Sequence, residues 1–199
     1  CGEKNILFTN NDSAYETAIS LIQKGINVEA IIDNREEIDS KLIYDVEKNN
    51  VKIFKGYTVT NTFGYKRINK ISIKQLSKDG QKVIGSIINL SCDCLGVSGG
   101  WTPAVHLFTQ SGGKLKFREE DQVFIPSVYP SDQISLGSCN GDFTLDEILT
   151  NAHKSLKEFL EIKNTEYENL EILSSSNKLK RNIWLLPSDK IQGKTKSFV

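Results

Sequence analysis

The sequence has no methionine among its 199 residues, only two histidines and only four prolines. The absence of methionine extends to the first position, so we expect an excised piece of a longer chain. No apolar run approaches the roughly 18 residues that would suggest a membrane span. The start, Cys1 to Lys4, has no signal-peptide character. We therefore expect a soluble, cytoplasmic chain.

A net charge of either sign is also lacking, because 25 basic residues balance 25 acidic ones. This balance excludes a broad electrostatic field that would recruit nucleic acid or an acidic membrane. The length suits one domain or two small ones, with enough chain to bury a core.

Cysteine is scarce, and its spacing is uninformative. The four cysteines are Cys1, Cys92, Cys94 and Cys139. The Cys-x-Cys pair at 92 and 94 is neither a zinc spacing nor a redox Cys-x-x-Cys motif. We expect reduced, buried thiols.

The two histidines do not indicate a catalytic site. His106 lies in a predicted short helix among apolar neighbours, where a packed, hydrogen-bonded histidine is the favoured interpretation. His153 falls on the polar side of another predicted helix. No Ser-His-acid set, metal cluster or phosphate-binding P-loop is present, so we predict no catalytic residue and no metal site.

What the sequence does have is an opening strand, helix and strand. Asn5 to Thr9 is a short apolar strand, a helix follows with Ser13 as its expected cap, and Gly25 closes that helix. A second strand, Val28 to Ile32, ends at Asp33. This order predicts the start of a doubly wound sheet.

The first turn lacks the glycines of a dinucleotide-binding fingerprint. It reads Thr9-Asn10-Asn11-Asp12-Ser13, and the carboxylate of Asp12 would repel a phosphate. Asp33 stands where a ribose-binding acid would be expected, but a turn residue at the end of a strand is the favoured interpretation. We predict no nucleotide at this turn.

Alternating apolar residues follow a polar helix predicted within 36–50 and a third strand over 51–54. An Asp79-Gly80 turn interrupts the alternation, as in a hairpin. The predicted fold class is α/β: a Rossmann-like βαβ sheet with an antiparallel β-meander, as in the inner NAD(P)-type domain of two-dinucleotide-domain flavoproteins. We place this domain at residues 1–133, a returning strand and helix of an outer nucleotide domain at 134–162, and a linker at 163–199.

Two glycine-rich stretches stand out further along the chain. The first, 95–113, turns sharply at Ser98-Gly99-Gly100-Trp101, and Trp101 is expected to pack or to meet a partner. The second has a predicted strand over Ile134–Leu136, then Gly137, then a helix from Thr144 to about Ile162. Thr144 and Glu147 have the spacing of a capping box.

Several motifs resemble the alpha subunit of heterotetrameric sarcosine oxidase. They are VSGGWTPAVHLFTQSGGKLKF at 97–117, LGSCNGDFTLDEIL at 136–149, TNNDSAYETA at 9–18 and WLLPSDKIQGKTKSFV at 184–199. The resemblance runs along essentially the whole chain and keeps the segments in order.

The resemblance implies an enzyme that oxidatively demethylates sarcosine to glycine and hydrogen peroxide and passes the one-carbon unit to tetrahydrofolate. It places the flavin chemistry (FAD/FMN) on the beta chain and the folate chemistry in a C-terminal half of the alpha chain, both outside these residues. The fragment itself is then expected to be catalytically silent. It would complete an NAD cleft and contact the beta chain and the rest of the alpha chain, with the meander and the Trp101 loop as candidate surfaces.

The one predicted binding element is the turn that leads into the second helix. A turn before a capped helix directs free N–H groups and the positive end of the helix dipole to one point, which suits a pyrophosphate. In related flavoproteins the residue after the glycine is an Asp that holds the flavin ribityl chain. Ser138 stands there instead, which argues against FAD. By resemblance, Gly137, Ser138, Phe143 and Leu145 form one wall of an NAD site.

Two alternatives stay open. One is the alpha chain of another amine or amino-acid dehydrogenase, opine or proline dehydrogenase-like. The other is a scaffold that binds a partner subunit and no nucleotide, which the missing glycines at Thr9 to Ser13 favour.

Overall fold

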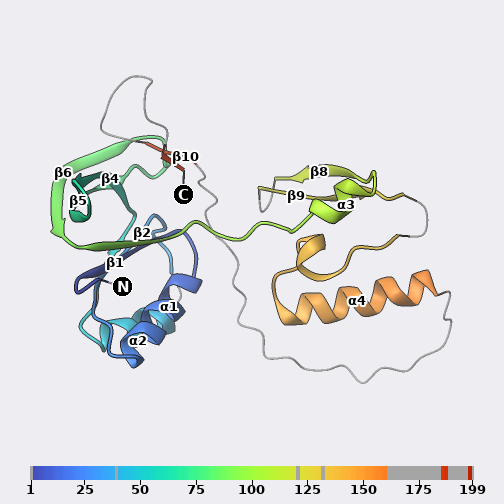
Figure 1. Cartoon of the computed structure of the whole chain (residues 1–199), viewed down its shortest axis with the longest axis horizontal. Helices are drawn as coiled ribbons and strands as arrows, with labels where there is room; N and C mark the ends of the chain where they lie inside the picture. The colour runs from blue at the N-terminus through green and yellow to red at the C-terminus, as the bar shows by residue number, and fades with distance from the viewer. Residues whose placement is uncertain are drawn as a thin grey trace. The chain divides into compact units, whose positions relative to one another are not determined.

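The computed structural model describes residues 2–38, 40–119, 122–130, 133–160, 185–187 and 197–198. The chain divides into two compact units, one formed by Cys1–Gly100 with Leu179–Val199 and the other by Trp101–Lys178. Figure 1 shows the elements of each unit. The predicted linker at 163–199 lies almost entirely outside the described residues.

The first unit is built on a four-stranded parallel sheet with the order β3-β2-β1-β7. Its strands are β1 (Asn5–Thr9), β2 (Val28–Asp33), β3 (Lys52–Lys55) and β7 (Cys94–Ser98). All five residues of β1 are buried, as expected for a central parallel strand that is covered on both faces.

Two helices cross between these strands. Helix α1 (Ser13–Gln23) joins β1 to β2, and α2 (Ser40–Glu47) joins β2 to β3. They pack on one face of the sheet, where Leu7 and Ile31 meet Tyr15, Ala18 and Val46. The predicted strand, helix and strand are confirmed, and so is the polar helix within 36–50.

An antiparallel meander covers the other face. It consists of β4 (Tyr57–Gly64), β5 (Ile68–Leu76) and β6 (Val83–Ser91), in that order. Ile71 and Ile73 of β5 pack against Ile6, Phe8 and other side chains of the parallel sheet. The predicted turn at Asp79-Gly80 joins β5 to β6, with Gly80 at φ +72°. The predicted fold class is confirmed.

A short antiparallel pair, β10 (Leu185–Leu186) and β11 (Ser197–Phe198), also belongs to the first unit. Leu186 contributes to the core beneath the meander.

The second unit contains a short helix, a hairpin and a longer helix. These are α3 (His106–Gln110), β8 (Lys114–Arg118) paired with β9 (Val123–Val128), a 3-10 turn η1 (Gly137–Asn140) and α4 (Leu145–Phe159). No residue of α4 is buried, and Leu149, Leu156 and Phe159 of its apolar side are 42–50% exposed.

One predicted strand is wrong. Residues Ile134–Leu136 are irregular and run directly into η1. A strand needs a neighbour for its N–H and C=O groups, and no described strand pairs with this segment. The helix that follows is confirmed, with Thr144 as its cap.

Candidate functional site

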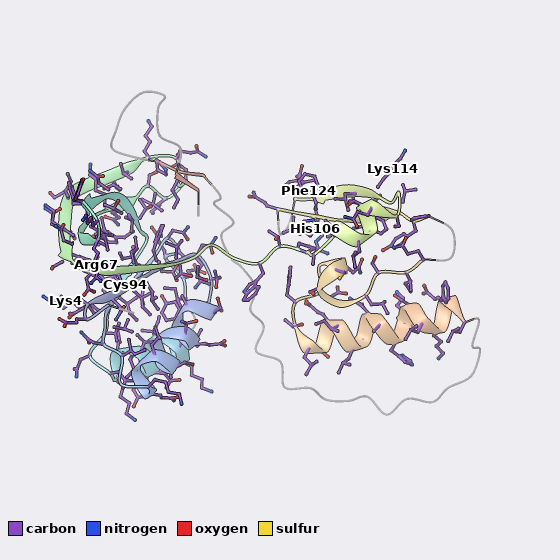
Figure 2. The ribbon with its side chains drawn as sticks, in the orientation of Figure 1. Lys4, Arg67, Cys94, His106, Lys114 and Phe124 are labelled. Carbon is purple, nitrogen blue, oxygen red and sulfur yellow. The ribbon has the colours of Figure 1, made fainter. Side chains whose placement is uncertain are left out.

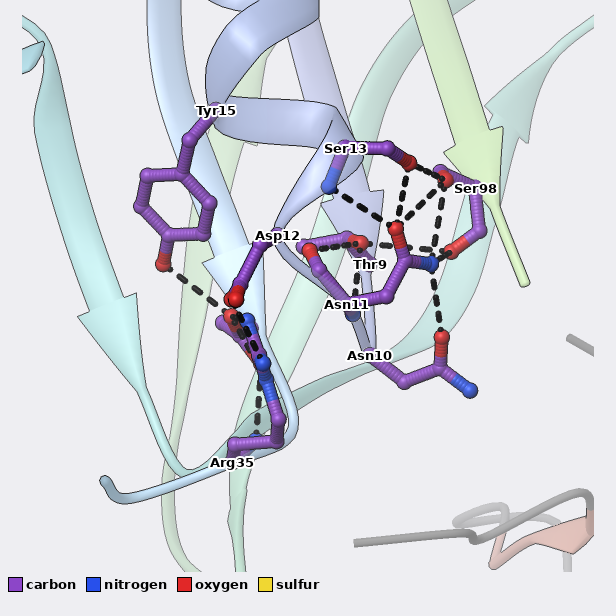
Figure 3. A network of polar contacts seen from close by, with 9 residues as sticks. Thr9, Asn10, Asn11, Asp12, Ser13, Tyr15, Arg35 and Ser98 are labelled. Carbon is purple, nitrogen blue, oxygen red and sulfur yellow. Dashed lines mark hydrogen bonds and ion pairs between the residues drawn. The ribbon is translucent and has the colours of Figure 1, made fainter. Parts of the chain in front are cut away.

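The turn between β1 and α1 is organised around the side chain of Asn11 (Figure 3). Its amide nitrogen donates to the carbonyl oxygen of Ser98 at 3.0 Å and to the Ser98 hydroxyl at 3.1 Å. Its amide oxygen accepts from the backbone N–H of Ser13 at 3.1 Å and from the Ser13 hydroxyl. Asn11 thereby ties the end of β1 and the start of α1 to the end of β7.

Neighbouring polar groups close the same turn. Asn10 donates to the carbonyl oxygen of Gly99 at 3.0 Å, and the Thr9 hydroxyl donates to the carbonyl oxygen of Asn11 at 3.0 Å. Thr9, Asn10 and Asn11 are each at most 3% exposed. In this strand order the direction of winding reverses between β1 and β7, where open α/β sheets bind their ligands. In this chain the side chains of Thr9, Asn10 and Asn11 hydrogen-bond to protein groups at that position.

A buried ion-pair network lies beside the turn. The Arg35 guanidinium contacts the Asp33 carboxylate at 2.8 Å and the Asp12 carboxylate at 2.7 Å. The Arg35 backbone N–H also donates to Asp33 at 2.9 Å. Arg35 is 3% exposed and Asp33 is fully buried, so each charge depends on the other for compensation.

The hydroxyl of Tyr15 completes this network by donating to Asp33 at 3.0 Å. Burial first, and then the Asp33 carboxylate, raise the pKa of Tyr15 far above its usual range. Burial also raises the pKa of Asp33, while the hydrogen bonds from Arg35 act in the opposite direction. Tyr15 therefore stays protonated and serves as a hydrogen-bond donor.

These contacts refine the predictions for the first turn. Asp12 does carry a carboxylate there, and Arg35 neutralises it. The expected cap by Ser13 is wrong, because α1 begins at Ser13 and the Asn11 side chain accepts from the Ser13 N–H. The roles of Asn11 and Arg35 were missed. The polar run after an apolar strand and the Asp-x-Arg spacing at 33–35 are the signals that could have found them.

The second turn, at 137–145, contains the predicted binding residues. Gly137 is buried with φ +68°, a left-handed conformation that favours glycine, and it opens η1. Ser138 is exposed, Phe143 is 39% exposed and Leu145 is 59% exposed. The structure thus places all four residues on one continuous turn, three of them with accessible side chains.

The capping box at the start of α4 is confirmed. The Thr144 hydroxyl accepts from the Glu147 N–H, and the Glu147 carboxylate accepts from the Thr144 N–H, both at 3.3 Å. Asp146 adds a second acid in the first turn. These carboxylates place negative charge at the helix start, so a phosphate bound there would be repelled by them and would compete with Glu147 for the Thr144 N–H.

Side chains of β8 and α4 hydrogen-bond to the second turn. Arg118 donates to the carbonyl oxygen of Gly141 at 2.9 Å, and Asn151 donates to one carboxylate oxygen of Asp142 at 2.9 Å. The other Asp142 oxygen is buried and has no hydrogen-bond partner among the described residues. The second turn therefore has a buried polar atom without a hydrogen-bond partner in the described part of the chain, whereas the Asn11 side chain at the first turn uses both its amide nitrogen and its amide oxygen.

A cavity of about 400 Å³ lies beside this turn. Its lining comes from Tyr129, the segment before η1, and the last turns of α4. Asn140 of η1 contributes, whereas none of the four predicted residues lines it. The volume lies within the usual range for small-molecule sites.

The histidine and cysteine predictions are partly corrected. His106 is exposed on α3, because Phe108 takes the single buried position of that short helix. His153 is half-buried. Cys92 is buried as expected, but Cys94 is half-buried and Cys139 lies exposed on η1, and all three are free thiols. Trp101 is 62% exposed.

The described residues contain no group of three or more His, Cys, Asp or Glu side chains that could hold a metal ion. None of the helices in the described part of the chain has the length and apolar character needed to cross a membrane.

Comparison with proteins of known sequence identifies three relatives, each a sarcosine oxidase subunit alpha. The protein from Corynebacterium sp. (strain U-96) is 31% identical over 140 residues, which are 70% of this chain and 14% of the relative. The one from Rhizobium meliloti is 27% identical over 124 residues, or 62% of this chain and 11% of the relative. The chain thus spans between about one ninth and one seventh of the length of the relatives it matches. No family model matches it.

Solved structures of similar fold include a thioredoxin reductase and a flavoprotein disulfide reductase. Thioredoxin reductase of T. acidophilum superposes with a TM-score of 0.52 at 16% identity, covering 79% of this chain and 52% of that one. The flavoprotein disulfide reductase RclA of Escherichia coli gives 0.55 at 14% identity, covering 80% and 36%. At these identities the likeness establishes the fold alone. The sequence comparison confirms the resemblance: over about 70% of its length this chain is a relative of one segment of the sarcosine oxidase alpha subunit.

Proposed function

We propose that this chain is a non-catalytic part of a sarcosine oxidase alpha subunit, in an enzyme that converts sarcosine to glycine and hydrogen peroxide and passes the one-carbon unit to tetrahydrofolate. The observation that supports the oxidoreductase role is the 31% identity to a sarcosine oxidase alpha subunit over 140 residues. In this proposal the flavin and folate chemistry lies outside the chain.

A non-catalytic role agrees with the side chains of the first unit. Its strongest polar cluster, around Asn11 and Arg35, is internally satisfied and almost fully buried. A general acid or base has to reach the proton that it transfers. These groups instead reach one another, so their role is to fix the parallel sheet to its helix.

The second unit is the proposed place for half of an NAD site. Phe143 and Leu145 expose apolar surface next to the Gly137-Ser138 turn, which suits a base or sugar of a dinucleotide. The pyrophosphate would have to avoid or displace the Glu147 carboxylate. NAD would supply hydride chemistry when bound, and these residues would only bind and orient it.

Binding of NAD to the purified chain tests this half-site. Native mass spectrometry should show an NAD adduct that weakens about tenfold or more in Ser138→Glu, because a second carboxylate would face the ligand phosphates. Ser86→Glu is a matched exchange at an exposed position of β6 in the first unit, away from the four predicted residues and from the cavity beside them. An equal loss in both variants, or no adduct with the unmodified chain at millimolar NAD, would rule out the half-site.

The scaffold alternative has its own supporting observation. Glu147 and Asp146 place two negative charges at the helix start where a dinucleotide phosphate would bind. If the chain binds no NAD and an absorbance scan detects no flavin, a scaffold that contacts partner subunits is the remaining role. A flavin in the isolated chain that sarcosine reduces would contradict both forms of the proposal.

A further inference from the structure

One segment of the first unit is strongly basic although the whole chain is neutral. Residues 52–78 include seven Lys or Arg and no Asp or Glu. This segment forms β3 and the β4–β5 hairpin. Because the other residues of the chain carry the balancing acids, the hairpin presents a local positive field on a molecule with no net charge.

The tip of the hairpin is fully open to solvent. Six consecutive residues, Thr62 to Arg67, are exposed, and the Tyr65 side chain is 97% exposed. Gly64, with φ +146°, makes the tight turn possible, since a Cβ there would overlap the Arg67 carbonyl oxygen. A tyrosine so exposed buries no apolar surface within the fold. Tyrosine and arginine are typical of the residues that dominate protein interfaces.

The tip carries two adjacent cations, Lys66 and Arg67. Lys66 and Arg67 form no salt bridge within the part of the chain that the structure describes. The Lys70 ammonium lies 4.2 Å from the centre of the Phe63 ring. Arg67 and Lys4 lie at the same end of the first unit in Figure 2.

The charge of Arg67 interacts with Asp93, and the Asp93 carboxylate already has hydrogen-bond partners. Its carboxylate accepts the backbone N–H groups of Glu3 at 2.9 Å and Lys4 at 2.8 Å. Those hydrogen bonds first, and then the Arg67 charge, lower the pKa of Asp93. Because Asp93 is held by two backbone N–H groups and forms no salt bridge with either cation in the described structure, Lys66 and Arg67 keep their capacity for a further anion.

A small hollow lies at this tip. It has a volume of about 210 Å³ and is lined by Thr62 to Ile68. Pockets for small molecules usually measure about 300–1,000 Å³, so this hollow is closer in size to a single amino-acid side chain. Sequence-independent binding of single-stranded nucleic acid uses successive stacking aromatics, whereas Tyr65 is the one fully exposed ring at the tip.

We propose that the hairpin tip docks an acidic segment of a partner protein, with a Glu or Asp carboxylate held by Lys66 and Arg67 and an apolar neighbour packed on Tyr65. This inference rests on the proposed role of the chain as part of a multi-subunit enzyme, and it specifies the chemistry of the partner surface. Charge complementarity of this kind favours encounter and fixes register.

Fluorescence anisotropy with a defined acidic peptide tests the proposal. The probe is a fluorescein-labelled peptide of eight glutamates flanking one phenylalanine, titrated with the full chain at low salt. Reversing both tip charges, Lys66→Glu with Arg67→Glu, should weaken binding about tenfold or more, and Tyr65→Ser about threefold. Lys24→Glu with Lys48→Glu is the control, because both lysines are exposed and lie outside the basic segment.

The outcomes separate the partner classes. Equal weakening in the control pair, or no binding of the peptide up to about 1 mM, would overturn the proposal. Tighter binding of a dT20 oligonucleotide or of phosphatidylserine vesicles than of the peptide would also overturn it, in favour of a nucleic acid or a membrane. Circular dichroism melts check that each variant is folded. The peptide titration contains no NAD. Its result is therefore independent of whether the chain binds NAD at the proposed half-site.

Discussion

The turn before α1 and the turn before α4 arrange their polar groups in opposite ways. At the first turn, Asn11 and Arg35 satisfy the neighbouring polar groups inside the protein, and exposure there is at most 3% for Thr9, Asn10 and Asn11. At the second turn, the capping box uses two 3.3 Å hydrogen bonds at the exposed start of α4. A turn that leads into a helix is therefore closed by buried hydrogen bonds in one place and accessible to solvent in the other.

The difference follows from what each turn is packed against. The first turn lies between two parallel strands, β1 and β7, and beside the end of β2, so any unpaired polar group there is desolvated. The second turn follows an irregular segment and precedes a helix with no buried residue. Water can replace its hydrogen bonds at little cost.

Removing the central cation of the first turn should have the largest effect. Arg35→Met leaves the buried Asp33 carboxylate and its neighbour Asp12 without compensation, and we expect a loss of about 3–5 kcal/mol in the free energy of unfolding. Urea denaturation of the full chain measures it. The control, Arg67→Met, removes an exposed guanidinium and should change stability by less than about 0.5 kcal/mol.

A second variant distinguishes charge from packing in that experiment. Adding Asp33→Asn to Arg35→Met removes the fully buried uncompensated charge and should restore part of the stability. If the single exchange costs less than about 1 kcal/mol, or if the double variant is no more stable, the ion pair does not close the first turn.

Much of the first unit could be predicted because its signals are local. The order of strands, the helix end at Gly25 and the Asp79-Gly80 turn follow from apolar periodicity and turn residues. The buried network could not be predicted in the same way. Asn11 bonds to Ser98, 87 positions along the chain, and only the pairing of β1 with β7 brings the two together.

The second unit shows the opposite limit of prediction. The capping box of Thr144 and Glu147 is a four-residue pattern and was found. The expected strand at 134–136 was wrong, since a strand depends on a partner that a local pattern cannot supply. The burial of Phe108, which leaves His106 exposed, likewise depends on packing rather than on the helical spacing.

The Tyr15 hydroxyl at the first turn should make the free energy of unfolding depend on pH, and its removal should have a smaller effect than removal of Arg35. The folded pKa of Tyr15 is raised above its unfolded value of about 10. The contribution of Tyr15 to the free energy of unfolding is therefore complete below about pH 10. As the pH rises above this value, the free energy of unfolding falls by up to about 1.4 kcal/mol per pH unit. Tyr15→Phe should cost about 1 kcal/mol at pH 8 by losing the bond to Asp33.

The two stability curves should then converge above pH 10 and cross near about pH 11, because the phenylalanine variant has no hydroxyl to ionise. Urea denaturation at pH 8, 10 and 11 measures the difference between the two proteins. Tyr44→Phe is the control, as Tyr44 is 65% exposed, and its curve should stay parallel to that of the unmodified chain. Parallel curves for Tyr15→Phe would mean that the hydroxyl is not held in a desolvated network.

The smallest effect on stability is expected at the second turn, where the comparison predicts a gain in binding instead. Glu147→Gln keeps a side-chain oxygen for the Thr144 N–H and removes the negative charge, so stability should change by less than about 0.5 kcal/mol. The helix dipole then faces a ligand phosphate without a competing carboxylate. NAD affinity should rise about threefold, measured by isothermal titration calorimetry. Asp45→Asn removes a carboxylate outside this turn and should leave affinity unchanged. A fall in affinity for Glu147→Gln would show that the exposed turn does not exchange its own acid for a ligand, and that both turns are closed by the protein itself.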